Sequence, residues 1–78
     1  MSFISIYKAD GLWVAGGYGT GLYYSIDGKI WKQSNITSGH IFSIYNANGL
    51  WVVGGSTSKG ILYSVDGKTW TSSNITSK

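Results

Sequence analysis

The sequence predicts an all-β protein built from two copies of one four-stranded antiparallel unit. Three observations support this fold class. The chain repeats itself at a spacing of 38 to 39 residues, and each copy contains four short segments rich in Ile, Val, Trp, Tyr and Phe, separated by turn residues. No segment shows the periodicity of an amphipathic helix. The copies occupy residues 1–39 and 40–78, so the repeat covers essentially the whole chain.

The repeat is defined by four pairs of matching segments. The offset between copies is 38 residues at first, and becomes 39 beyond a loop that is one residue longer in the second copy. Loops are the expected place for such a change in length. The matching pairs are SIY at 5–7 and 43–45, GLWV at 11–14 and 49–52, SIDGKIW at 25–31 and SVDGKTW at 64–70, and SNITS at 34–38 and 73–77.

Each copy is expected to form four consecutive strands. The expected strands are 3–7, 12–16, 22–26 and 31–36 in the first copy, and 41–45, 50–54, 61–65 and 70–75 in the second. Asp-Gly or Asn-Gly pairs, which tolerate the positive φ of tight hairpins, lie between the first two strands and between the last two of each copy. These pairs are at 10–11, 27–28, 48–49 and 66–67.

The faces of the strands indicate how the units pack. The second strand carries Leu12 and Val14 on one face and Trp13 and Ala15 on the other, so both faces are apolar. The fourth strand is polar after its Trp. A sheet that is buried on both sides at its inner strands and exposed to solvent at its last strand is typical of a β-propeller blade. Four-stranded blades have about 40 to 45 residues, which is close to the repeat length here. We therefore predict two four-stranded antiparallel blades, at 1–39 and 40–78.

The segments at 25–31 and 64–70 resemble the Asp-box of sialidase-type (BNR) and related propeller repeats, which reads Ser/Thr-x-Asp-x-Gly-x-x-Trp. One residue is missing here between Asp and Gly. The resemblance implies a propeller in which this motif forms the hairpin between the third and fourth strands and has a structural role. Sialidases use several Arg with Tyr and Glu, but this chain contains neither Arg nor Glu, so their activity is not expected.

The residues of these turns are predicted to be structural. Each Asp can accept hydrogen bonds from the N–H groups of its own turn, the Ser can do the same across the hairpin, and the Trp is expected to enter the blade core. Trp13 and Trp51 are expected mid-strand between blades. The predicted turn and core residues are Ser25, Asp27, Gly28, Trp31, Ser64, Asp66, Gly67, Trp70, Trp13 and Trp51.

Composition argues against catalysis and against metal or cofactor binding, so we expect no catalytic residue and no cofactor. The chain has no Cys and a single His, His40, which is expected to be an exposed residue at a strand start. Asp27 and Asp66, one repeat apart, make neither an acid/base pair nor a calcium cage. The glycine-rich segment 16–21 is followed by no helix, so a hairpin is favoured over a phosphate loop.

Charge and hydropathy indicate few external partners. The net charge of +3 comes from six dispersed Lys, which favours a role in solubility over nucleic-acid binding. We expect a soluble protein with no signal peptide and no transmembrane segment, in an unknown compartment. The sequons at 35–37 and 74–76 are interpreted as copies made by the repeat, and glycosylation stays the alternative.

Two functions remain. The first is a structural module that closes a propeller by homo-oligomerisation, with a tetramer of eight blades preferred to a trimer of six; its boundaries favour an excised, reconstructed or designed fragment of a longer propeller. The alternative is a lectin-like module that binds a glycan or another ligand through the loop between the second and third strands, which differs most between copies. The expected ligand-facing residues are Tyr18, Thr20, Ser56, Thr57, Ser58 and Lys59.

Overall fold

The computed structural model describes residues 2–56 and 60–74, which form two four-stranded antiparallel sheets and no helix. The strands of each sheet lie in chain order. They are β1 (Ser2–Ala9), β2 (Leu12–Tyr18), β3 (Leu22–Ser25) and β4 (Lys32–Gln33) in the first sheet, and β5 (His40–Ala47), β6 (Leu50–Ser56), β7 (Leu62–Ser64) and β8 (Thr71–Ser72) in the second. The predicted all-β chain of two four-stranded antiparallel units is confirmed.

The first hairpin of each sheet turns through two residues with positive φ. In the first sheet Ala9 pairs with Leu12, and the turn between them has φ of 54° at Asp10 and 74° at Gly11. Two successive positive φ values characterise the type I′ turn, whose twist matches that of the flanking strands. The second sheet repeats this turn at residues 48–49.

A β-bulge interrupts both first strands at the same place, between Phe3 and Ser5 in β1 and between Ile41 and Ser43 in β5. An extra residue in one strand breaks the strict alternation of its side chains between the two faces. Phe3 therefore shares a face with Ile6, three residues along, and both line one groove.

The third and fourth strands are shorter than predicted. β3 ends at Ser25, whose hydroxyl accepts a hydrogen bond from the N–H of Gly28 and so starts the turn early. β4 and β8 have only two residues each. Beyond β4 the chain stays beside β3 through irregular hydrogen bonds, because Ser34 donates its N–H to Leu22 O, and the N–H of Leu22 reaches Ile36 O.

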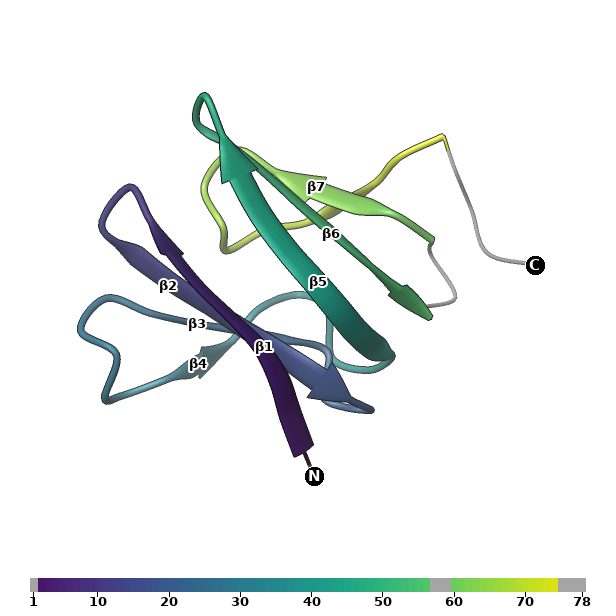
Figure 1. Cartoon of the computed structure of the whole chain (residues 1–78), viewed down its shortest axis with the longest axis horizontal. Helices are drawn as coiled ribbons and strands as arrows, with labels where there is room; N and C mark the ends of the chain where they lie inside the picture. The colour runs from purple at the N-terminus through teal and green to yellow at the C-terminus, as the bar shows by residue number, and fades with distance from the viewer. Residues whose placement is uncertain (1, 57–59, 75–78) are drawn as a thin grey trace.

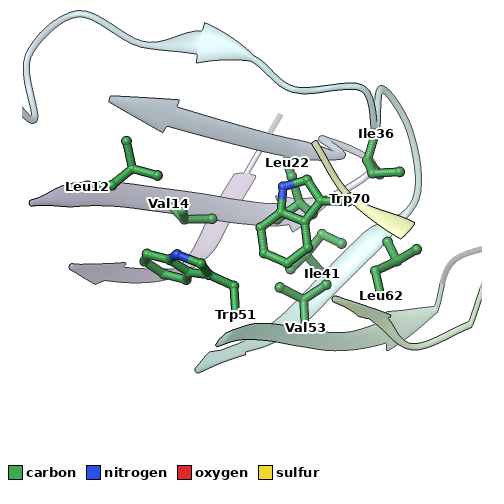
Figure 2. Packing of buried hydrophobic residues seen from close by; sticks show 9 residues of the cluster. All are labelled: Leu12, Val14, Leu22, Ile36, Ile41, Trp51, Val53, Leu62 and Trp70. Carbon is green, nitrogen blue, oxygen red and sulfur yellow. The ribbon is translucent and has the colours of Figure 1, made fainter. Parts of the chain in front are cut away.

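The two sheets pack face to face, and the core lies between them. Figure 1 shows them as separate layers in which β5 lies next to β1 and β2. Figure 2 shows that both sheets contribute to one apolar cluster, with Trp70 near its centre. The cluster consists of Leu12, Val14, Leu22 and Ile36 from the first copy and Ile41, Trp51, Val53, Leu62 and Trp70 from the second.

Within the described ranges, the structure contains no helix of the length and apolarity that crossing a membrane requires.

Candidate interaction surface

Each sheet has one face in the shared core and one face turned away from it. Paired residues of neighbouring strands lie on the same face of a sheet, so the pairing of Ala15 with Ile6 and Tyr23 places these three together on the side opposite Val14. We call this side the first outer face. It consists of Phe3, Ile6, Trp13, Ala15, Tyr23 and Trp31.

The first outer face contains an apolar groove of about 450 Å³. Phe3 and Tyr23 meet edge to face, with their ring centroids 5.6 Å apart. Phe3 and Ile6 are half or more exposed, at 50% and 59%. The groove is lined by Phe3, Ile6, Ala15, Tyr23 and Trp31. It is therefore an open, largely aromatic surface.

The second sheet presents a different apolar surface, which we call the second outer face. It consists of Tyr45, Leu50, Val52, Ile61 and Tyr63, and each of these side chains is 37% or more exposed. Their counterparts in the first copy lie at or against the shared core. Val14 is fully buried, for example, whereas its counterpart Val52 is 38% exposed.

The repeat relates the two outer faces to the contact inside the chain. Each residue of the first outer face occupies the position of a residue that the second sheet directs into the core. The corresponding pairs are Phe3 and Ile41, Ile6 and Ile44, Trp13 and Trp51, Ala15 and Val53, Tyr23 and Leu62, and Trp31 and Trp70. The second outer face corresponds in the same way to the core-facing side of the first sheet. We call the packing contact between two neighbouring sheets a joint. The two outer faces thus correspond to the two sides of the joint inside the chain.

Two glycines at equivalent positions of the repeat, Gly16 and Gly54, show the same correspondence between the outer face and the contact inside the chain. A Cβ on Gly16 would lie 2.6 Å from the Cβ of Ile41, so the sheets touch closely at this point. The counterpart of Gly16 on the second outer face is Gly54, and a Cβ there would meet no atom within 4 Å. The hollow that Ile41 fills inside the chain is therefore open at Gly54.

Polar contacts hold the joint between the sheets in register. The side chain of Asn35 donates from Nδ2 to Trp70 O at 3.0 Å, and its Oδ1 accepts the N–H of Trp70 at 2.8 Å. The hydroxyl of Ser5 donates to Phe42 O at 2.6 Å. This contact of Asn35, which the sequence marks only as part of a sequon, was not predicted; its place in the repeated SNITS segment was the available signal.

The two Asp turns have nearly the same geometry. Oδ1 of Asp27 accepts the backbone N–H groups of Lys29 at 2.8 Å and Ile30 at 3.1 Å and the hydroxyl of Ser25 at 3.1 Å. In the second copy Asp66 accepts the corresponding N–H groups of residues 68 and 69 and the hydroxyl of Ser64. These carboxylates are occupied by their own turns.

The same hydrogen bonds lower the pKa of both carboxyl groups below the ordinary value of 3.8. For Asp27 the N–H groups of Lys29 and Ile30 are the main causes, since they stabilise the ionised form. For Asp66 the N–H groups of residues 69 and 68 act in the same way. Both groups are thus held as acceptors for their turns.

The four Trp side chains divide into two classes. Trp51 and Trp70 are buried in the core between the sheets, at 1% and 3% exposure, whereas Trp13 and Trp31 are half-buried on the first outer face. Trp51 and Trp70 are thus core residues, as predicted, whereas the expectation that Trp31 enters the blade core is wrong, because Trp31 lies on the first outer face. A single sheet has no interior, and the core formed by residues 2–56 and 60–74 lies between the two sheets.

The loop residues predicted to face a ligand do not form one group. Tyr18 is 54% exposed, and Ser56 is exposed at the end of β6. Thr20 is buried: its Oγ1 accepts the N–H of Gly17 at 2.7 Å and donates to Gly21 O at 2.8 Å. Its prediction as a ligand-facing residue is wrong, because its hydroxyl closes its own loop. Thr57, Ser58 and Lys59 lie outside the described residues.

His40 starts β5 and is exposed, as expected. Its Nδ1 accepts the N–H of Gly19 at 2.8 Å, and its ring meets Tyr18 edge to face and stacks on Phe42. Because Gly19 belongs to the first copy, the imidazole joins the two copies at one end of the sheets. Nothing in the repeat predicts this contact, since Ser2 occupies the equivalent position.

A second hollow of about 220 Å³ lies beside the first Asp turn, with Tyr24, Asp27, Lys32 and Lys68 among its lining residues. The Lys68 ammonium is 5.7 Å from the centre of the Tyr24 ring. Among residues 2–56 and 60–74 there is no group of three His, Cys, Asp or Glu side chains that could hold a metal ion.

Comparison with protein families, curated proteins and solved structures finds no match to this chain.

Proposed function

We propose that this chain is a self-assembling repeat module that closes a symmetric β-propeller. In this proposal the second outer face of one chain packs on the first outer face of the next and copies the contact between the two sheets inside the chain. The observation that carries it is the repeat equivalence of the faces: every residue of the first outer face stands where the second sheet places a residue facing its partner sheet.

The chemistry of the two faces supports this docking. The second outer face repeats the Tyr, Leu, Val and Tyr that the first sheet presents to the core, with Ile61 in place of Leu22. The first outer face exchanges the aliphatic Ile41 and Leu62 for the larger Phe3 and Tyr23. Both surfaces remain apolar, so the joint between chains would be similar in character to the joint within the chain.

The exposed apolar area gives this association a driving force. Fully burying one large apolar side chain contributes about 1.5–3 kcal/mol. Soluble monomers rarely leave such side chains in contiguous patches, and a larger patch marks an interaction site. Here Tyr45, Leu50 and Val52 are 62%, 40% and 38% exposed on a single face.

The geometry of the contact leads to a ring. Two different faces meet in each joint, so the contact is heterologous and propagates until rotation closes the assembly. Each chain supplies two blades, and propellers have about four to eight, so the ring holds an even number. Bulky Trp and Tyr side chains keep neighbouring sheets apart and favour a wide ring. We therefore place the tetramer of eight blades first and the trimer of six blades second.

Blocking one face at a time tests this assembly. Val52→Asp places a charge on the second outer face, and Ile6→Asp places one on the first. Sedimentation velocity should show each variant alone as a monomer. An equimolar mixture should contain a dimer of one chain of each kind, because only one intact pair of complementary faces is left. A dimer formed by either variant alone would mean that like faces pair, and would contradict the proposal.

Binding of a glycan is the second candidate. It is favoured by an exposed aromatic group at the end of the joint, where Tyr18 lies 5.6 Å from His40 and 5.8 Å from Phe42 between ring centroids. Aromatic faces combined with a polar tip suit recognition of mixed apolar and polar ligands. A glycan array probed with the assembled protein tests this role, and binding that Tyr18→Ala abolishes would support it.

A further inference from the structure

The contact between Asn35 and Trp70 is an unusually complete polar contact between the two sheets. Trp70 lies just ahead of β8, the outermost strand of its sheet, and it directs its backbone N–H and C=O towards the linker that joins β4 to β5. Asn35, in that linker, satisfies both groups with its single amide, at 2.8 and 3.0 Å. The side chain thus takes the place of a neighbouring strand at this edge.

The equivalent edge of the first sheet has no such partner. Trp31 lies just ahead of β4 as Trp70 lies ahead of β8. Within residues 2–56 and 60–74, the backbone N–H and C=O of Trp31 have no hydrogen-bond partner, and its indole Nε1 donates to Gly28 O. One donor and one acceptor are left facing outward.

The chain also carries an unused copy of the amide. Asn74 stands 39 residues after Asn35, at the same position in the repeated SNITS segment. Asn74 is exposed, and its side chain has no hydrogen-bond partner in the described part of the chain. The two halves of the contact are therefore present in one chain, Trp31 in the first copy and Asn74 in the second.

We infer that Asn74 of one chain clamps the backbone N–H and C=O of Trp31 in the next chain, and that this contact sets the register of the joint. The inference rests on the proposed head-to-tail assembly. The apolar faces provide most of the association energy, but apolar burial is non-directional. Two hydrogen bonds from one planar amide specify a single offset between the sheets.

The expected strength follows from ordinary hydrogen bonds. One intramolecular hydrogen bond contributes about 0.5–1.5 kcal/mol net, so loss of two weakens each joint by about 5- to 150-fold. Asn74→Ala should therefore raise the concentration at which the ring dissociates by at least about 5-fold. Asn74→Asp should also weaken the ring, because a carboxylate accepts the N–H of Trp31 but cannot donate to its C=O.

Amide hydrogen exchange followed by NMR reads the contact directly. In the assembled wild-type chain the N–H of Trp31 should be protected as strongly as that of Trp70. In Asn74→Ala the protection of Trp31 should fall while that of Trp70 is kept. The matched control is Asn35→Ala, which should expose the N–H of Trp70 and leave Trp31 protected in whatever ring remains.

Failure of the clamp and failure of the assembly give different results. A ring in which Trp31 exchanges freely, and whose dissociation Asn74→Ala does not change, overturns the clamp and leaves the head-to-tail ring in place. A wild-type chain that stays monomeric overturns both.

Discussion

Gly16 and Ile41 are in such close contact that a Cβ on the glycine would lie 2.6 Å from the Cβ of the isoleucine. Any side chain at residue 16 must therefore push β5 away from β2. Overpacking of this kind costs about 1–3 kcal/mol.

The same substitution at Gly54 separates folding from assembly. We expect Gly16→Ala to lower the free energy of unfolding of the chain, measured by urea titration. Gly54→Ala meets no atom within its own chain and should leave that energy unchanged, but it should weaken the oligomer because Phe3 of the next chain would occupy the hollow. Equal assembly of Gly54→Ala and the wild type would contradict the docking of these faces.

The matched tryptophans Trp13 and Trp51 should differ in their contribution to the chain. In the Val52→Asp background, which blocks assembly, Trp51→Ala should lower the free energy of unfolding by about 3–5 kcal/mol in a urea titration, because it leaves a cavity in the core. Trp13→Ala should cost less than half as much, since Trp13 is only half-buried there. If Trp51→Ala does not fold, Trp51→Phe and Trp13→Phe give the same ranking on a smaller scale. Equal losses at the two positions would contradict the assigned core.

Acid should destabilise the chain through the two Asp turns. Both carboxyl groups have a lowered pKa in the folded state, so their contribution is complete above the unfolded value, about 3.8, and is lost as the pH falls through the folded value. The urea midpoint should change little between about pH 7 and 5 and then fall below about pH 4. The Asp27→Asn, Asp66→Asn double variant should have a lower midpoint at pH 7 and a flatter decline in acid. An acid decline as steep as that of wild type would show that other groups cause it.

Thr20 should contribute to stability and not to ligand binding. Thr20→Val keeps the shape but leaves the buried N–H of Gly17 without its acceptor, which costs about 1–3 kcal/mol. Thr20→Ser keeps the hydroxyl and should avoid most of that loss. Thermal unfolding of the two variants checks the ranking, and equal melting temperatures for Thr20→Val and the wild type would rule out this role.

Local features were predictable from the sequence where local chemistry decides them. Asp10-Gly11 fixes a type I′ turn whatever surrounds it, and the Ser and Asp of each Asp turn bond within five residues of one another. Strand ends were less predictable. The turn that Ser25 starts with the N–H of Gly28 ends β3 one residue before the apolar pattern does.

Features that depend on which sheet has a neighbour were not predictable in this way. Trp13 and Trp51 stand in the same tetrapeptide, GLWV, yet one is half-buried on an outer face and the other is in the core. Only the order of the two sheets in space distinguishes them. Asn35 was missed for the same reason, because its partner Trp70 is 35 residues away and belongs to the other sheet.

Native mass spectrometry of the 78-residue chain at micromolar concentration tests the head-to-tail ring most directly. One chain has a mass of 8.4 kDa, so a closed tetramer of eight blades should appear as one species at about 34 kDa, four times that mass. A single species at about 25 kDa, three times the chain mass, would keep the ring and change its blade number to six. A folded monomer at 8.4 kDa, or a ladder of masses without a closed end point, would contradict the ring.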